Sequence, residues 1–175
     1  MEVNHIGLIS NDLVKHTEIV IDGKELLTFY IDKSQGLETH QHLHIGSNGS
    51  TQLIKNINTF NVGHSQLEID FIKESFTRLD KIIDLDFSEM DNNNGSMLDI
   101  YRISYSTTFG DGVIGQAISQ RAQEGAWWDI LWKDSPNLQT EGINSNFNTI
   151  LHEIGHTLGL KHPFDDPTNK SWNSK

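Results

Sequence analysis

The chain has 175 residues, enough for one domain with a substantial core, and carries a net charge of −11 with 35% hydrophobic residues. The negative charge argues against nonspecific nucleic-acid binding and docking on anionic lipid, and it fits a soluble or secreted protein or one that holds cations. Cysteine is absent, so there is no disulfide framework and any metal site has to use His, Asp and Glu. No stretch approaches the ~18 apolar residues of a membrane span, and no secretory signal peptide is visible.

The first half of the chain is predicted to contain a hairpin, a long loop and a helix. β-Branched and aromatic residues fill Glu18–Ile21 and Glu25–Ile31 around an Asp-Gly pair, which predicts two strands joined by a turn. Residues 33–65 have few apolar anchors and are predicted to be loop with one short strand. Over Ser65–Leu85 the apolar residues recur at helical spacing, which indicates an amphipathic helix.

The second half is predicted to contain strands followed by a helix. Three strands and one long helix are expected in the order Leu98–Tyr105, Val113–Ser119, Trp127–Trp132 and Asn146–Leu160. Composition predicts turns at Asp91–Gly95 and Thr108–Gly112. The whole order of hairpin, helix, three strands and helix predicts an α+β or mixed α/β arrangement.

The last predicted helix carries a histidine pair away from its apolar ridge. Ile150, Ile154 and Leu158 repeat at i, i+4 and i+8, which predicts a buried ridge. His152 and His156 each follow a ridge residue by two positions, about 200° around the helix, so they face a cleft. They also lie one turn apart, so both imidazoles can reach one ion.

Three further residues complete a pattern with its own chemistry. Gly159 can enter a left-handed turn that ends the helix, after which the chain folds back and delivers His162 as a third ligand. Three protein ligands leave one zinc position open for a water whose pKa falls to near ~7. Glu153, beside His152, is the natural general base for that water. The competing explanation is a surface helix that happens to be rich in His, but the fixed offsets of Gly159 and His162 argue against it.

The segment His-Glu-Ile-Gly-His-Thr-Leu-Gly-Leu-Lys-His at residues 152–162 resembles the long zinc signature of the metzincin metallopeptidases. Pro163 resembles the serralysin branch, and the likeness is strongest over Phe147–Pro163 and weaker back to Gln66. The resemblance implies a zinc-dependent metalloendopeptidase, in which Glu153 is the catalytic base and the ligands are His152, His156 and His162. It also implies a metzincin-like N-terminal subdomain: a twisted mixed β-sheet with one backing helix and an active-site helix.

The same resemblance implies where substrate binds and how the chain is divided. An extended protein or peptide substrate would pair antiparallel with the cleft-edge strand made of Val113, Ile114, Gly115, Gln116, Ala117 and Ile118. Residues 66–175 resemble a catalytic domain that ends before the clan's methionine turn, since the last Met is Met97 and no Tyr follows Tyr105. Residues 1–65 are first strands, linker or propeptide remnant. The resemblance further implies an extracellular monomer, exported by a C-terminal signal.

Two other functions compete with this interpretation. One is a catalytically inactive zinc-binding interaction module derived from a peptidase, against which the presence of Glu153 counts. The other is hydrolysis of a different amide, such as a cell-wall peptide.

Three features are each open to a functional and a plain structural interpretation. Structural Ca²⁺ is weighed at Asp91–Gly95 and at Phe109–Gly112, and a plain turn is favoured at both. The alternating His40, His42 and His44 would share one face if extended, but a solvated polar loop is favoured over a second metal site. Core packing is favoured over a substrate-facing wall for the aromatic residues Trp127, Trp128 and Trp132.

Overall fold

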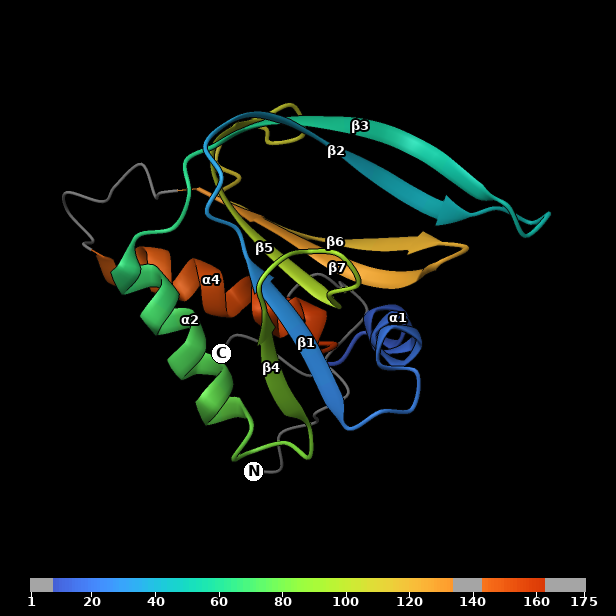
Figure 1. Ribbon diagram of the computed structural model, residues 1–175, viewed down its shortest axis with the longest axis horizontal. Helices are drawn as coiled ribbons and strands as arrows, with labels where there is room; N and C mark the ends of the chain where they lie inside the picture. Colours follow the sequence, from blue (N-terminus) through green and yellow to red (C-terminus); the bar gives the residue numbers. More distant parts are fainter. Residues whose placement is uncertain (1–7, 134–142, 163–175) are drawn as a thin grey trace, which may run out of the picture.

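The structure is a computed structural model that describes residues 8–133 and 143–162. Its architecture is mixed α+β: a twisted, open, seven-stranded mixed sheet with three helices in these two ranges, so the expected α+β class is confirmed. Helices α2 and α4 lie on one side of the sheet, and a long hairpin of β2 and β3 lies on the other (Figure 1).

Four strands of the sheet, β4, β1, β5 and β7, run parallel to their neighbours among these four, and the pairs that involve β2, β3 and β6 run antiparallel. β1 lies between β4 and β5, and β5 also pairs with β7; these three pairs are parallel. β6 is antiparallel to β7, and β3 is antiparallel to both β2 and β5. The strands are β1 (Leu26–Ile31), β2 (Gly36–Ile45), β3 (Thr51–Asn61), β4 (Asp86–Met90), β5 (Leu98–Ser106), β6 (Gly115–Ala122) and β7 (Gly125–Trp132). Among the described strands β7 is the only partner of β6, so the other edge of β6 is open.

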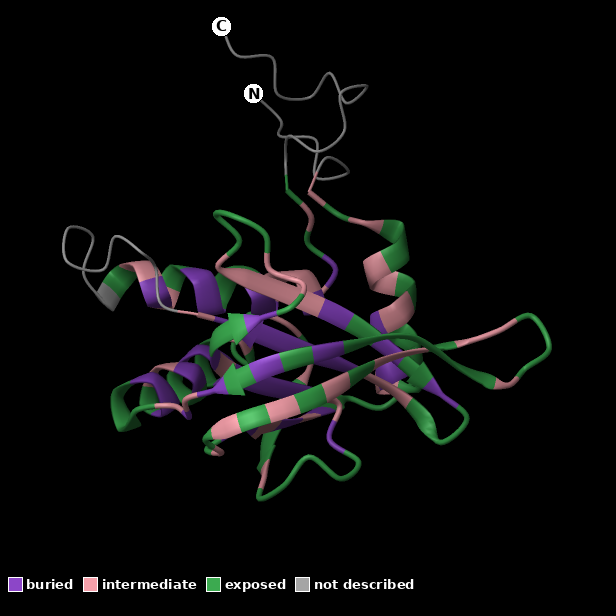
Figure 2. Ribbon diagram, turned by 90° about the horizontal axis from the view of Figure 1, so that it is seen from above, coloured by how far each residue is buried: buried purple, intermediate pink, exposed green. Residues whose placement is uncertain are grey.

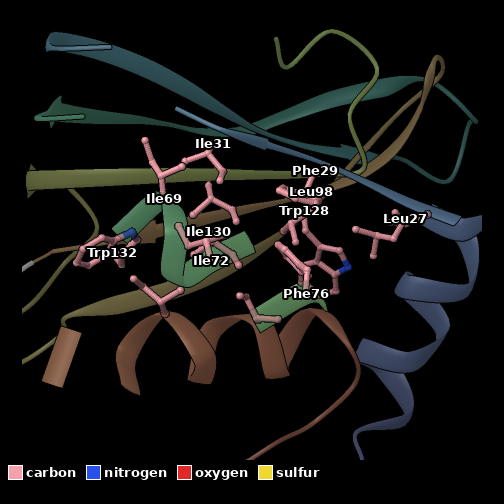
Figure 3. Close-up of a cluster of buried hydrophobic side chains, with 14 residues drawn as sticks. Leu27, Phe29, Ile31, Ile69, Ile72, Phe76, Leu98, Trp128, Ile130 and Trp132 are labelled. Carbon is pink, nitrogen blue, oxygen red and sulfur yellow. The ribbon is translucent and has the colours of Figure 1, made fainter. Parts of the chain in front are cut away.

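Three helices pack against one face of the sheet: α1 (Asn11–Ile21), α2 (Gln66–Leu79) and α4 (Ile143–Thr157). Alternate residues of β1, β5 and β7 point toward them, since side chains of a strand alternate between its faces. The resulting core buries Leu27, Phe29, Ile31, Leu98, Ile100, Trp128, Ile130 and Trp132 of the sheet against Val20, Ile69, Ile72, Phe76, Ile150 and Ile154 of the helices (Figure 3). Each such side chain contributes about 1.5–3 kcal/mol of transfer free energy, so this core fixes where α4 lies.

The β2–β3 hairpin, called the arm below, covers the opposite face of the sheet. Ile57 of the arm packs with Tyr101, Ile103, Ile118 and Leu131 in a second, smaller core. Over the last five residues of β3 buried positions alternate with exposed ones, and along most of β2 half-buried positions alternate with exposed ones (Figure 2), as expected for strands with one solvated face.

A buried polar network fastens the arm to the sheet. The Gln120 side chain accepts a hydrogen bond from Leu43 N–H of the arm at 2.8 Å and donates one to the Asp129 carboxylate at 2.6 Å. Asp129 lies beside Asp99 in the register of β5 and β7, and both carboxyls are buried. Burial raises the pKa of Asp99 to about 8, helped by the nearby Asp129. Burial also raises the pKa of Asp129 to about 6, against the effect of its hydrogen bonds from Gln120 and Trp127.

The predicted hairpin at Glu18–Ile31 is wrong in its first half. Residues Asn11–Ile21 form α1, which Ser10 caps by accepting a hydrogen bond from Leu13 N–H, and only Leu26–Ile31 is a strand. The Asp-Gly pair ends the helix: Asp22 has φ of 52° and Gly23 has φ of 72°. Two consecutive residues with positive φ occur at the ends of helices as well as in hairpin turns. The Asp-Gly pair was therefore interpreted as a hairpin turn although it ends α1.

The loop predicted for residues 33–65 is also wrong, because most of it forms the two strands of the arm. These strands have few apolar anchors since only their inner face packs, on the small core around Ile57. Strand β4 was not predicted at all; it is short and charged, and only Phe87 packs against the main core.

The other predicted elements are confirmed with shifted ends. The first long helix ends at Leu79 rather than Leu85, the strand predicted at Val113–Ser119 spans Gly115–Ala122, and α4 covers Ile143–Thr157. Strands β5 and β7 and the turns at Asp91–Gly95 and Thr108–Gly112 lie where expected. In the described part of the chain, every helix is too short or too polar to cross a membrane.

Candidate metal centre

Helix α4 divides its residues between the core and an open cavity. Ile150 and Ile154 are fully buried, and Leu158 packs against the same core, so the predicted ridge is confirmed. His152 and His156 leave the helix on the other side and remain partly open to solvent. The burial of the ridge therefore sets the direction in which the two imidazoles point.

The Nε2 atoms of three histidines converge on one point. Those of His152 and His162 are 2.8 Å apart, those of His152 and His156 are 3.0 Å apart, and those of His156 and His162 are 3.2 Å apart. Of the described His, Asp and Glu side chains, only these three gather closely enough to hold a metal ion together. His162 reaches the group because α4 ends in a turn at Gly159, which has φ of 95°.

The donor set fits a small divalent cation. The His156 Nδ1–H donates to the Leu160 carbonyl at 2.7 Å, which leaves a lone pair on Nε2 in the neutral ring. Neutral imidazoles cannot satisfy three converging ring nitrogens with one another, since each has a single N–H. Tetrahedral zinc with Zn–N bonds of ~2.0–2.1 Å sets the nitrogens about 3.3 Å apart, close to the spacing here. The His152 pKa is lowered by burial, then by His156 and His162, which favours the neutral form that binds metals.

Glu153 lies next to the triad but is buried, with 5% of its surface exposed. Its carboxylate points from α4 to β6, where it accepts a hydrogen bond from the Ala117 backbone N–H. Burial raises the pKa of Glu153 to about 7, partly offset by this hydrogen bond. A carboxyl with such a pKa can both take up and release a proton near neutral pH.

The carboxylate fits against β6 because residue 115 is glycine. A Cβ at Gly115 would lie 2.8 Å from Cγ and Cδ of Glu153 and closer still to Oε1. Neither Gly115 nor the Ala117 N–H was identified from the sequence as a support of Glu153. The only signal was a glycine inside a predicted strand, which often marks close approach of a backbone or ligand.

A cavity of about 610 Å³ joins these parts. One wall is the chain from Gly112 to Ala117, and the other is α4, with Ser145, Asn148 and Thr149 beside the histidines and Glu153. Of the predicted substrate strand, Val113 and Ile114 lie just before β6, and Gly115, Gln116 and Ala117 belong to it. Ile118 is different, because its side chain is buried in the small core under the arm.

The remaining predicted features lie elsewhere. His40, His42 and His44 belong to strand β2 rather than a loop, and a bulge after His42 separates them: His40 and His42 are half-buried, whereas His44 is exposed. Trp128 and Trp132 are core residues, as favoured. The third tryptophan, Trp127, is half-buried and donates to Asp129 at 3.1 Å. Pro163, on which the serralysin likeness rests, lies outside the described residues.

No protein-family model matches the chain, and no curated protein is similar enough to it to count as a match.

Proposed function

We propose that the chain is a zinc-dependent metalloendopeptidase that hydrolyses peptide bonds in proteins. The observation that carries the proposal is the meeting of three parts in one cavity: the converging Nε2 atoms of the histidine triad, the buried Glu153 carboxylate and the open edge of β6. The segment 152–162 supports the same conclusion through its resemblance to the metzincin signature.

The three histidines would hold the zinc ion, which supplies a Lewis acid and an acidified water when bound. Glu153 would take a proton from that water on its carboxylate and pass it later to the leaving amine. The Ala117 N–H keeps this carboxylate on the cavity side of α4. The Leu160 carbonyl fixes the His156 tautomer, so that Nε2 is free to coordinate.

The open edge of β6 supplies a binding mode for the substrate. The Ile114 carbonyl accepts from Lys133 N–H, just beyond β7, so the alternation of an antiparallel ladder turns the backbone groups of Gly115 and Ala117 to the open edge. The Ala117 N–H binds Glu153, so the Gly115 N–H and the two carbonyls are the groups offered to a substrate. An extended peptide can pair with such an edge through its main chain. Apart from the metal centre and Glu153, the cavity is lined by neutral residues, which favours recognition of backbone over charge.

We further propose that the chain is a serralysin-like peptidase, that it is extracellular and that it is a monomer. These three points rest on the sequence resemblance alone. Structural Ca²⁺ at Phe109–Gly112 stays an alternative to the plain turn.

The test is zinc content and hydrolysis of a denatured protein such as casein, with product mass spectrometry to identify the bond. The wild type is expected to bind about one zinc and to cleave peptide bonds. Glu153→Gln should keep the zinc and lose roughly 10²–10⁴-fold in rate. Glu124→Gln, at the exposed β6–β7 turn, is the matched control and should leave the rate unchanged. Full activity in Glu153→Gln would refute the mechanism.

Zinc uptake without hydrolysis of any substrate would instead favour the inactive zinc-binding interaction module. Cleavage of a cell-wall peptide but not of casein would change the proposed substrate from proteins to cell-wall peptides and would leave the proposed mechanism unchanged.

A further inference from the structure

The turn that carries His162 has little support from its own helix. Gly159 N–H donates to the His156 carbonyl and Leu160 N–H to the Gly155 carbonyl, both at 3.0 Å. Beyond Leu160 the chain has left α4. A ligand on such an extension keeps its place only if other parts of the fold restrain the backbone, because ordering each residue costs conformational entropy.

That restraint comes from the start of the described chain. Ser10 N–H donates to the Gly159 carbonyl, and Lys161 N–H donates to the Leu8 carbonyl, both at 2.9 Å. Between them Ile9 forms an antiparallel bridge with Leu160. Segment 8–10 therefore holds the backbone at Gly159 and at Lys161, and Lys161 directly precedes the third ligand, His162.

Helix α1 fastens the same turn from its inner side. The buried Thr17 hydroxyl donates to the Thr157 carbonyl at 2.7 Å, where α4 ends. The Val14 Cγ2 lies 2.6 Å from the position that a Cβ on Gly159 would take. Gly159 thus serves two purposes, a positive φ and the close approach of α1.

The held turn also acts on a second ligand, because the Leu160 carbonyl accepts from His156 Nδ1–H. Partners of this kind orient metal-bound histidines and set their tautomer, and losing one typically costs 10–100-fold in metal affinity. Anything that fixes Leu160 therefore fixes both His156 and His162.

We infer that segment 8–10 and helix α1 form an N-terminal strap that positions two of the three ligands of the metal centre. The strap rests on the proposed metal centre but not on peptide hydrolysis. Some of the residues that set the metal affinity would then lie about 140 residues before the ligands in the sequence.

The test is zinc affinity of the full chain, measured by competition with a chromophoric chelator. Ser10→Pro removes the N–H that binds the Gly159 carbonyl and is expected to weaken zinc binding at least about tenfold. Ser10→Ala is the matched control: it loses only the side-chain cap of α1 and should stay within about threefold of wild type. In the Co²⁺ form, Ser10→Pro should also lose intensity in the visible absorption of a four-coordinate site.

A second pair of variants covers the case in which Ser10→Pro fails to fold, as judged by metal-free melting. Thr17→Val deletes the hydroxyl that binds Thr157 and should weaken zinc binding about tenfold. Thr77→Val on α2 deletes a similar hydroxyl, which donates to its own helix at Lys73, and should leave affinity unchanged.

Two results would overturn the strap: zinc affinities of Ser10→Pro and Thr17→Val within twofold of their controls, or Ser10→Ala as weak as Ser10→Pro. A wild type that binds no zinc would overturn the metal centre and the strap together. Tight zinc binding without hydrolysis would leave the strap standing and remove the peptidase proposal alone.

Discussion

The contact between Gly115 and Glu153 predicts a variant that keeps its fold and its metal but loses activity. Gly115→Ala introduces a Cβ that would lie 2.8 Å from Cγ and Cδ of Glu153, whereas ordinary contact begins at 3.4 Å. The atoms that meet it are the far end of a flexible side chain, so we expect Glu153 to retreat and β6 to stay in place. The required displacement is about 0.6 Å or more.

The expected loss of activity follows from that displacement. Misplacing a reacting group by ~1 Å costs about 10²-fold in rate, or about 2.7 kcal/mol in the activation free energy. We expect kcat to fall about 30–100-fold, and KM to change less than about threefold because the backbone groups at the open edge are unaltered. Stability should change by less than about 1 kcal/mol, since alanine is favoured over glycine inside a strand.

The assay compares kcat, KM, zinc content and melting temperature in Gly115→Ala and Gly110→Ala. The second variant is the control, because a Cβ at Gly110 meets no atom within 4 Å. Exchange of the Ala117 amide hydrogen should accelerate in Gly115→Ala if the carboxylate has moved away. A kcat within threefold of wild type, or loss of zinc along with kcat, would refute the reasoning.

Three further predictions concern stability in urea. Asp99 keeps its proton up to pH about 8 when folded but loses it near 3.8 when unfolded, so the free energy of unfolding should fall by about 1.4 kcal/mol per pH unit between these values. From pH 6.5 to 8, without metal, the free energy of unfolding should fall more steeply in wild type than in Asp99→Asn, by about 1.4 kcal/mol per pH unit, and equal slopes would contradict the raised pKa of Asp99. Phe147→Ala loses a ring stacked 3.9 Å from Phe71 and should cost about 3 kcal/mol at neutral pH; a cost under 1 would contradict the packing. Ser65→Ala breaks the capping box with Glu68 and should cost about 1 kcal/mol, seen as a lower urea midpoint.

Sequence periodicity predicted the helices and strands that bury one face over many residues. Helix α2 shows it best, because its apolar residues recur over four turns and Ser65 marks its start. Helix α1 was missed since only Thr17 and Val20 are fully buried along it, and its β-branched residues favour strand by composition. The arm was missed because its inner face meets the sheet mainly through polar side chains and Ile57, which leave no apolar stripe in the sequence.

In the candidate site, the residues close together in the sequence could be predicted, whereas those that come from distant segments could not. Both helical histidines, Glu153 and His162 fall within eleven residues, so helical geometry and one glycine turn were enough to predict that they lie together. Gly115, the Ala117 N–H and the strap reach the site through tertiary contacts. No spacing rule connects Ser10 to Gly159, so these supports require the fold to be known.

The open edge of β6 also bears on how the protein behaves at high concentration. An unpaired strand edge invites another copy of the chain to add to it, and edge-to-edge pairing is a common route to aggregation. Here α4 lies across the cavity from this edge, and the Glu153 carboxylate accepts the hydrogen bond of the Ala117 N–H. A strand that adds here therefore meets the backbone groups of Gly115 and the Ala117 carbonyl, but finds the Ala117 N–H already bonded. The carboxylate proposed for proton transfer thus also removes one backbone donor from the edge at which another copy of the chain could add.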